Sequence, residues 1–351
     1  MAKCRIAVLY DQWNEVATQR EDASSRTGRK KLRRRPRGEP TEDIQEVFEA
    51  LKKAGHNPSF VVLDGTDDAL LGLARVEADL FFNLTESYRG DDTKDTNIAA
   101  YLDLLGRRYT GAGPEALYLA QDKPLAKKIF SFHGISTPTF ATVFRGRLEH
   151  AHDIRFPLIV KPAREDGSIG IEFSAVVNSI KELMERIDAL HIQLDSPVLL
   201  EEYVEGREIY VGILGNDKAE ALPLVELDLS KLPDGMPKIA GTEVKWEKDT
   251  DAYRQTKLVF PEDIDEKTTE KICSTAMAAY HALKLRDYGR IDIRLDKDGV
   301  PHVLEVNPNP YLLPKAEFPL AAKKAGRAYA DLINELVELA LARYGSGALT
   351  S

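Results

Sequence analysis

The chain has 351 residues, 43% of them hydrophobic and 30% charged, with 23 glycines and 18 prolines. This length exceeds the usual span of one hydrophobic core, so we expect two or three domains, and the composition excludes collagen-like, coiled-coil and wholly disordered proteins. No apolar run reaches the roughly 18 residues that a membrane helix needs, and the start MAKCRIAVLYDQWNE lacks the apolar core of a secretory signal. Because Cys4 and Cys273 are the only cysteines, a disulfide framework is not expected either. We expect a cytoplasmic protein with no membrane partner.

The net charge of −9 conceals a strongly basic segment. Residues 20 to 37 carry nine basic and two acidic side chains, which leaves the rest of the chain with a net charge of −16. An acidic body argues against a nucleic-acid-binding protein as a whole. The basic segment also lacks interleaved aromatic residues and apolar periodicity, so we expect a solvated, mobile loop. Polyanion binding by this segment is a weaker alternative.

Strand and helix signals alternate through the first hundred residues. Residues 3 to 10 (KCRIAVLY) predict a buried strand, and a helix is expected to begin after Thr41 as N-cap and to end at Gly55. Further strands are expected at residues 59–63 (SFVVL) and 79–83 (DLFFN). Such alternation is typical of a parallel sheet with helices on its faces.

A cluster of glycine and proline at residues 109 to 114 (YTGAGP) indicates a domain boundary. Beyond it the signals alternate less regularly, which predicts α+β domains with mixed sheets. The expected helices span residues 122–133, 179–190, 263–284 and a closing stretch to about 342; the expected strands span residues 156–162, 198–204, 207–215, 220–227 and a pair within 289–307.

That last pair, in the segment GRIDIRLDKDGVPHVLEVNPNP, has the pattern of a hairpin. Two strand-like runs flank Asp298-Gly299, a strong hairpin signal. If these two residues form the loop, Asp292 lies opposite Glu305. Arg290 then lies opposite Asn307, and because side chains alternate along a strand, all four share one face. The other face is expected to enter the core through Ile291, Ile293, Leu295, Leu304 and Val306.

Two carboxylates directly opposite each other on a sheet repel, and a divalent cation between them removes the conflict. Because Asp, Glu and Asn oxygens suit Mg²⁺ or Mn²⁺ better than zinc, we predict that Asp292, Glu305 and Asn307 are metal ligands. The alternative is a solvent-exposed polar face on which Arg290 and Arg294 neutralise the acids.

Magnesium with few protein ligands is usually completed by water and substrate phosphates, so phosphate-binding motifs are of interest. The chain has neither G-x-x-x-x-G-K-[ST] nor a G-x-G-x-x-G after its first strand, which argues against P-loop and dinucleotide-binding proteins. Residues 166 to 170 (DGSIG) form a loop between two strand-like runs. Taken alone, this loop is a weak phosphate-binding signal.

The motifs YTGAG, DK, FPLIVKPAREDGSIG, LLEEYVEGREI, TEVKW, GRIDIRLD and LEVNPNP follow one another between residues 79 and 326. In this order they resemble the motifs of the ATP-grasp ligases, and within that superfamily those of the D-alanine–D-alanine ligase group. The resemblance implies an N-terminal parallel α/β domain (residues 1–113, with a basic mobile loop at 20–40). Two α+β subdomains that sandwich ATP are then expected at residues 114–206 and 207–345.

The resemblance also implies roles for individual residues. Lys123 and Lys161 match the lysines that hold the ATP phosphates, and Lys245 matches a lysine on a mobile loop that reaches the γ-phosphate. Arg290 matches the arginine that stabilises the oxyanion; it would be catalytic together with Lys245 and Ser168. Asp292, Glu305 and Asn307 match the Mg²⁺ ligands. The remaining nucleotide contacts are implied for Gly167, Ser168 and Ile169 in the phosphate loop, for Glu201, Glu202, Tyr203 and Val204 near the adenine, and for Glu208 at the ribose.

Simpler interpretations exist for several of these residues. Lys161 could merely end a strand before Pro162, Glu201 and Glu202 could form a solvated edge, and Glu208 could pair with Arg207 on the surface. The implied reaction activates a carboxylate with ATP as an acylphosphate, which an amine then attacks. A homodimer is also implied, but only as the habit of the family.

The sequence departs from the family mainly on the substrate side. The Gly-rich, Glu-bearing N-terminal segment is replaced by YDQWNEVATQRED, and the His-Gly and Glu-Asp-Gly run by NLTESYRGDDTKDT. Gly167 and Trp246 stand where the family has a serine and a tyrosine, and PNPYLLPKAEF follows Asn307 where a small, Ser-containing stretch is expected. We therefore predict a carboxylate–amine ligase whose small-molecule substrates are expected to be amino acids other than two D-alanines. A true D-alanine–D-alanine ligase and an ATP-binding regulatory protein without turnover are the alternatives.

Overall fold

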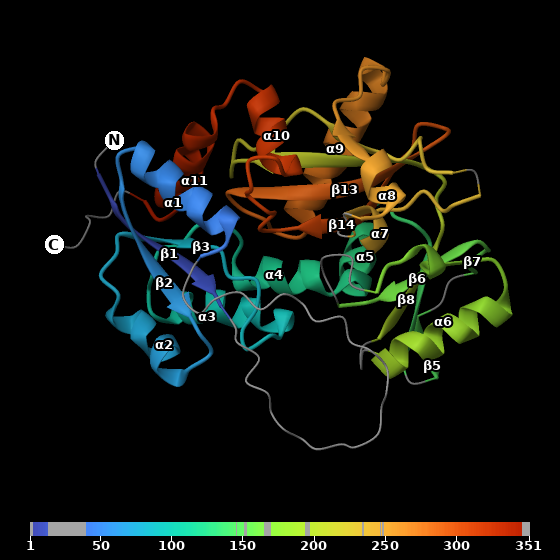
Figure 1. The fold of residues 1–351 in the computed structure, drawn as a ribbon, viewed down its shortest axis with the longest axis horizontal. Helices are drawn as coiled ribbons and strands as arrows, with labels where there is room; N and C mark the ends of the chain where they lie inside the picture. Colours follow the sequence, from blue (N-terminus) through green and yellow to red (C-terminus); the bar gives the residue numbers. More distant parts are fainter. Residues whose placement is uncertain are drawn as a thin grey trace.

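The computed structural model describes residues 3–12, 40–144, 146–150, 153–164, 170–193, 197–233, 235–245, 247 and 249–345. The described residues fold around three sheets (Figure 1). The basic segment at 20–37 and the loop residues Gly167, Ser168 and Ile169 lie outside them, so what the sequence predicts for these residues stays a prediction. None of the described helices combines the length and the apolar character of a membrane span.

The first sheet is parallel, as the alternating signals predict. Its strand order is β2 (Asn57–Leu63), β1 (Arg5–Asp11), β3 (Leu80–Asn83). Helix α1 (Glu42–Lys53) begins after Thr41, as expected, and the chain leaves it at Gly55, whose φ of 90° suits glycine. The other elements here are α2 (Asp67–Gly72), η1 (Leu73–Arg75), η2 (Asp92–Lys94) and α3 (Asp95–Leu104).

The second sheet, green at the right of Figure 1, is antiparallel. Its strand order is β5 (Arg147–His150), β4 (Phe140–Phe144), β8 (Val198–Glu202), β6 (Leu158–Pro162), β7 (Val176–Val177). Helices α4 (Pro114–Gln121) and α5 (Lys123–Phe132) precede it, and η3 (Phe173–Ala175) and α6 (Ile180–Gln193) lie between its strands in sequence. Apolar side chains of β6 and β8 pack with Leu190 of α6 in one hydrophobic cluster.

The third sheet is antiparallel and carries the predicted hairpin. Its strand order is β12 (Lys257–Val259), β11 (Val225–Asp228), β9 (Gly206–Leu214), β13 (Tyr288–Asp296), β14 (Pro301–Asn307), with β10 (Glu220–Ala221) on β9. Helix α9 (Glu266–Ala282) covers one face, where Ile272 joins the cluster of Ile209 and Ile291. Helix α10 (Glu317–Lys324) covers the other face. Its Phe318 ring packs so closely on Gly212 of β9 that a Cβ at this position would lie 2.9 Å from the ring, which is too close. The short helices α7 (Thr242–Lys245) and α8 (Asp251–Gln255) lie between β11 and β12 in sequence.

The last helix, α11 (Tyr329–Arg343), returns to the first sheet and packs against α1 (Figure 1). The predicted boundary after residue 113 falls directly before α4, and the boundary after residue 206 falls after the first residue of β9. The division into three domains at these residues stays a prediction.

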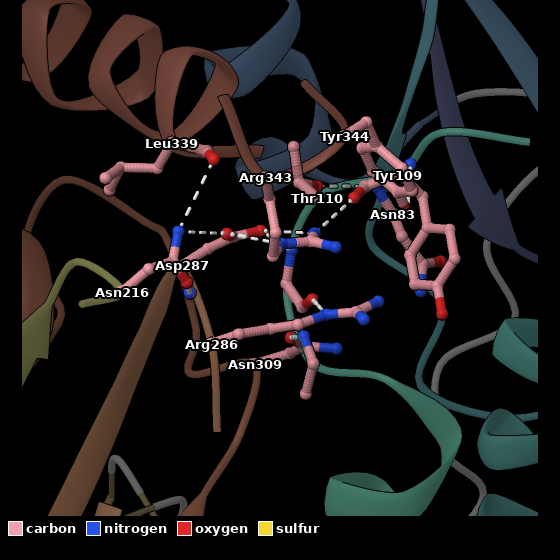
Figure 2. Close-up of polar contacts among 12 residues, drawn as sticks. Asn83, Tyr109, Thr110, Asn216, Arg286, Asp287, Asn309, Leu339, Arg343 and Tyr344 are labelled. Carbon is pink, nitrogen blue, oxygen red and sulfur yellow. Dashed lines mark hydrogen bonds and ion pairs between the residues drawn. The ribbon is translucent and has the colours of Figure 1, made fainter. Parts of the chain in front are cut away.

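A buried polar cluster attaches the YTGAG segment to the third sheet (Figure 2). Asp287, just before β13, is fully buried, and its carboxylate accepts hydrogen bonds from Gly111 N at 2.8 Å and from Asn216 Nδ2 at 3.1 Å. Arg343 of α11 donates to the same carboxylate through Nε at 3.0 Å and Nη2 at 2.9 Å. Arg286 Nε donates to Gly111 O at 2.9 Å. Three segments far apart in sequence are therefore joined at one carboxylate.

Candidate active site

The hairpin of β13 and β14 places the four predicted side chains as expected. Asp292 pairs with Glu305, and Arg290 pairs with Asn307. Residues directly opposite each other in an antiparallel ladder point to the same side of the sheet. Asp292 is only 2% exposed, so the alternative of a solvent-exposed polar face is wrong.

The loop of the hairpin differs from the expected two-residue turn. Asp296 N donates to Val300 O and Gly299 N donates to Asp296 O, both at 3.1 Å, so three residues form the loop, and Gly299 adopts a φ of 71°. This longer loop shifts the pairing by one residue, and an irregularity between Asp292 and Ile293 shifts it back. As a consequence Val303 is fully buried in the core, while Leu304, the residue that was expected there, is only partly buried. The predicted pairing at the site is correct because the bulge compensates for the loop.

The facing acids have the chemistry of a magnesium site. Burial raises the pKa of Asp292 to about 6, and the charge of Glu305 adds to this effect. Burial also raises the pKa of Glu305, but the charges of Lys123 and Lys161 outweigh it and hold the value at about 2. Asn307 Nδ2 is buried and has no hydrogen-bond partner within the described residues. Within the described residues there is no group of three or more His, Cys, Asp or Glu side chains that could hold a metal. The candidate ligands at the hairpin are two carboxylates and one amide.

Arg290 is held by acids on both sides. Its Nε and Nη2 donate to the two carboxylate oxygens of Asp292 at 2.7 and 3.0 Å, and Nη1 donates to Glu317 Oε2 at 3.0 Å. The guanidinium lies 5.1 Å from the centre of the Tyr210 ring. Burial lowers the pKa of Arg290, but the charges of Asp292 and Glu317 outweigh it and raise the value well above its ordinary range. Glu317 begins α10, and no local sequence signal predicts its contact with Arg290.

The three predicted phosphate-binding lysines come from three elements and surround the acids. Lys123, at the start of α5, is 3% exposed and its Nζ lies 3.8 Å from Glu305 Oε2. Lys161, in β6, is 5% exposed. Lys245 lies at the end of the helical turn α7 rather than on the expected loop, and its Nζ is 5.8 Å from the Tyr210 ring centre. The charge of Lys245 also acts on Glu305.

Glu201 in β8 is completely buried, so the interpretation of a solvated edge is wrong for this residue. Its carboxylate forms ion pairs with Lys127 of α5 and, at 2.6 Å, with Lys161 Nζ. Lys127 was not predicted, although it follows Lys123 by one helical turn and therefore lies on the same helix face. Burial lowers the pKa of Lys127 to about 8, against the opposing charge of Glu201.

The remaining predicted nucleotide contacts lie at the end of β8, directly after it, or in β9. Glu202 Oε1 accepts from Arg155 N at 2.9 Å, Tyr203 OH accepts from Lys238 N at 3.2 Å, and Val204 comes directly after them in the chain.

Glu208, on the same face of the third sheet as Asp292, is buried and pairs with Arg294 at 2.6 Å. The simpler interpretation of a Glu208–Arg207 surface pair is therefore wrong, because Arg207 pairs with Glu226 and Asp263 instead.

Known proteins resemble this chain both in fold and in sequence. The fold is that of the ATP-grasp enzymes: a D-alanine–D-alanine ligase of Bacillus anthracis, solved in complex with ATP, superposes with a TM-score of 0.69 at 22% identity, covering 98% of this chain and 100% of that one. The family model "D-ala D-ala ligase C-terminus" matches residues 129–338. A D-alanine–D-alanine ligase of Cupriavidus taiwanensis is 30% identical over 298 residues, covering 84% of this chain and 85% of that protein. An uncharacterized protein y4sG of Sinorhizobium fredii is 33% identical over 312 residues, covering 86% and 89%. The chain belongs to the D-alanine–D-alanine ligase family, whose members are ATP-dependent enzymes that form C–N bonds.

Proposed function

We propose that the protein joins a carboxylate to an amine through an acylphosphate, with ATP as the phosphoryl donor and with substrates other than two D-alanines. The observation that carries the reaction type is the facing pair of Asp292, which is buried, and Glu305, which is half-buried. The charges of Lys123, Lys161 and Lys245 act on Glu305. A site with two acids and three lysines on converging elements suits a metal-bound polyphosphate.

In the proposed reaction a carboxylate oxygen of the acid takes the γ-phosphoryl group of ATP, and ADP leaves. The amine nitrogen then bonds to the carbonyl carbon, the bond from that carbon to the phosphate oxygen breaks, and the amine gives up its proton as phosphate departs. Magnesium held by Asp292, Glu305 and Asn307 would supply charge neutralisation at the phosphates. The lysines offset the remaining charge and align the phosphates, and Arg290 stabilises the oxyanion at the carbonyl.

The residues at the carboxyl ends of β1 and β3 support an acid substrate other than D-alanine. In parallel sheets, ligands bind at this edge. Here Asp11 Oδ1 accepts from Glu86 N at 2.8 Å, and Asp11 Oδ2 accepts from Ser87 Oγ at 2.7 Å. The run NLTESYRGDDTKDT, which replaces the His-Gly and Glu-Asp-Gly run of the family, is thus joined to the end of β1 through Asp11 and Ser87. This changed edge of the sheet supports an acid substrate other than D-alanine.

Glu317 supports a changed amine substrate. Its carboxylate is 3.0 Å from Nη1 of Arg290, in the stretch where the family has small residues and serine. An α-amino acid that approached Arg290 with its own carboxylate would meet the like charge of Glu317. This arrangement favours amines that carry no carboxylate next to the reacting nitrogen.

The test is mass spectrometry of the products from pooled amino acids and amines with ATP and Mg²⁺, together with coupled ADP release. We expect a new amide and ADP in equal amounts, with Asp292→Asn at least about 100-fold slower and the exposed hairpin-loop variant Asp298→Asn unchanged. Phosphate release triggered by D-alanine alone would support a true D-alanine–D-alanine ligase, and other acid–amine pairs that react at least about a hundredfold better would exclude it. ATP binding without turnover of any pool would establish a regulatory protein.

A further inference from the structure

Two buried lysines, Lys127 and Lys161, share one buried carboxylate, that of Glu201. The side chains of Lys127 and Glu201 are each 1% exposed and that of Lys161 is 6% exposed. Both lysines form ion pairs with Glu201, one from α5 and one from β6. The group therefore contains two positive charges and one negative charge in a place that excludes water. An uncompensated buried charge is costly unless another anion joins it.

The two lysines differ in how firmly they are held. Lys127 Nζ also donates to Thr137 Oγ1 at 2.6 Å, and Thr137 in turn donates to Val303 O of β14 at 2.8 Å. Within the described residues Lys161 has one ion-pair partner, Glu201. The charge of Lys161 also lowers the pKa of Glu305, so its ammonium acts on the hairpin acids as well. Lys161 is thus the lysine whose ammonium can leave Glu201 for an arriving anion.

We infer that Lys127 is a positioning residue of the nucleotide site: by remaining paired with Glu201, it allows the Lys161 ammonium to transfer from that carboxylate to a nucleotide phosphate. Without Lys127, the departure of Lys161 would leave Glu201 buried and unpaired, and Lys161 would be retained. The pair of Lys127 and Glu201 also remains neutral after the transfer. The inference rests on the proposed role of this site in binding ATP.

Three variants test it by isothermal titration with ATP and with ADP, in Mg²⁺ and without acid or amine. Lys127→Met should weaken binding about tenfold or more, because nucleotide then competes with Glu201 for Lys161. Because the Glu201 carboxylate is paired with the two lysines, the inference gives its side chain no contact with the nucleotide, in contrast to the adenine contact that the resemblance implies. Adding Glu201→Gln to Lys127→Met removes the competition and should restore the dissociation constant to within about threefold of the wild type. Lys128→Met, at the exposed neighbouring position of α5, is the matched control and should bind as the wild type does.

In turnover assays Lys127→Met should raise the KM for ATP and leave the KM values for acid and amine unchanged, which a general structural defect would not do. Equal binding by Lys127→Met and Lys128→Met overturns the inference. A folded double variant that binds tenfold more weakly than the wild type also overturns the inference, because Lys127 or Glu201 would then act on the nucleotide itself. This measurement tests the inference even if Lys127→Met alone does not fold. Wild-type protein that binds ATP but forms no product refutes the proposed ligase reaction and leaves the inference standing.

Discussion

The buried carboxylate of Asp287 offers the sharpest test of what joins the parts of the fold. We consider Asp287→Asn, which preserves the shape of the side chain. Asp287 has a φ of 63°, a conformation that asparagine tolerates well, so the backbone is not strained by the change. The substitution removes the charge and replaces one acceptor oxygen with a donor. In the wild type Oδ1 and Oδ2 together accept four hydrogen bonds, two of them from Arg343.

The expected cost follows from burial and from the number of charged contacts. Asp287 is 0% exposed and the side chain of Arg343 is 17% exposed, so solvent screens this pair little. Breaking a buried pair by removing one charged partner costs about 3–5 kcal/mol. We expect Asp287→Asn to lower the free energy of unfolding by about this amount. Arg343→Met should lower the free energy of unfolding by a comparable amount. The loss in the double variant should be smaller than the sum of the two single losses by at least about 1 kcal/mol.

The assay is urea unfolding followed by circular dichroism at constant pH and salt. Asp251→Asn is the matched control, because Asp251 pairs with Arg254 on the surface, with side chains 87% and 62% exposed, and its unfolding midpoint should stay within error of the wild type. If Asp287→Asn unfolds at the same midpoint as Asp251→Asn, the cluster in Figure 2 does not stabilise the fold and the reasoning is refuted.

Three further predictions concern the site. Glu317→Leu should increase kcat/KM for amino acids relative to amines without a carboxylate by about fivefold or more; an unchanged ratio for D-alanine and D-alaninamide contradicts the role of Glu317. Chelation with EDTA should abolish ADP release in the wild type, and Mg²⁺ should restore it, whereas Asp292→Asn should show little response to either; full activity in EDTA would exclude the metal site. The pKa of Lys127, lowered by burial from 10.5 to about 8, means that the unfolded chain binds more protons between these values, so stability should rise with pH over this window. Unfolding curves at pH 7.5 to 10.5 should show this rise in the wild type relative to Lys127→Met/Glu201→Gln, and a parallel pH dependence of the two proteins would contradict it.

Much of the fold can be predicted from local patterns. The parallel pairing of β1 with β2 and β3, the start of α1 after Thr41 and the pairing of Asp292 with Glu305 all agree with the sequence. These features depend on the periodicity of neighbouring residues and on turn chemistry, which act over a few positions. The loop at Gly299 was less predictable, because Asp-Gly suits both a two-residue turn and the longer loop that the structure adopts.

The sequence by itself determined the two strands of the hairpin and the alternation of side chains along each strand, because these depend on neighbouring residues. The irregularity between Asp292 and Ile293, which sets Asp292 opposite Glu305 in spite of the three-residue loop, is a feature of the folded structure. Only the tertiary structure decided that Glu317 would contact Arg290, that Lys127 would share Glu201 with Lys161, and that Asp287 would join Arg343 to Gly111. Each of these contacts joins elements far apart in the chain, and each is set by how sheets and helices pack. The partner of a buried charge depends on which surfaces exclude water together, and no local pattern of residues encodes that.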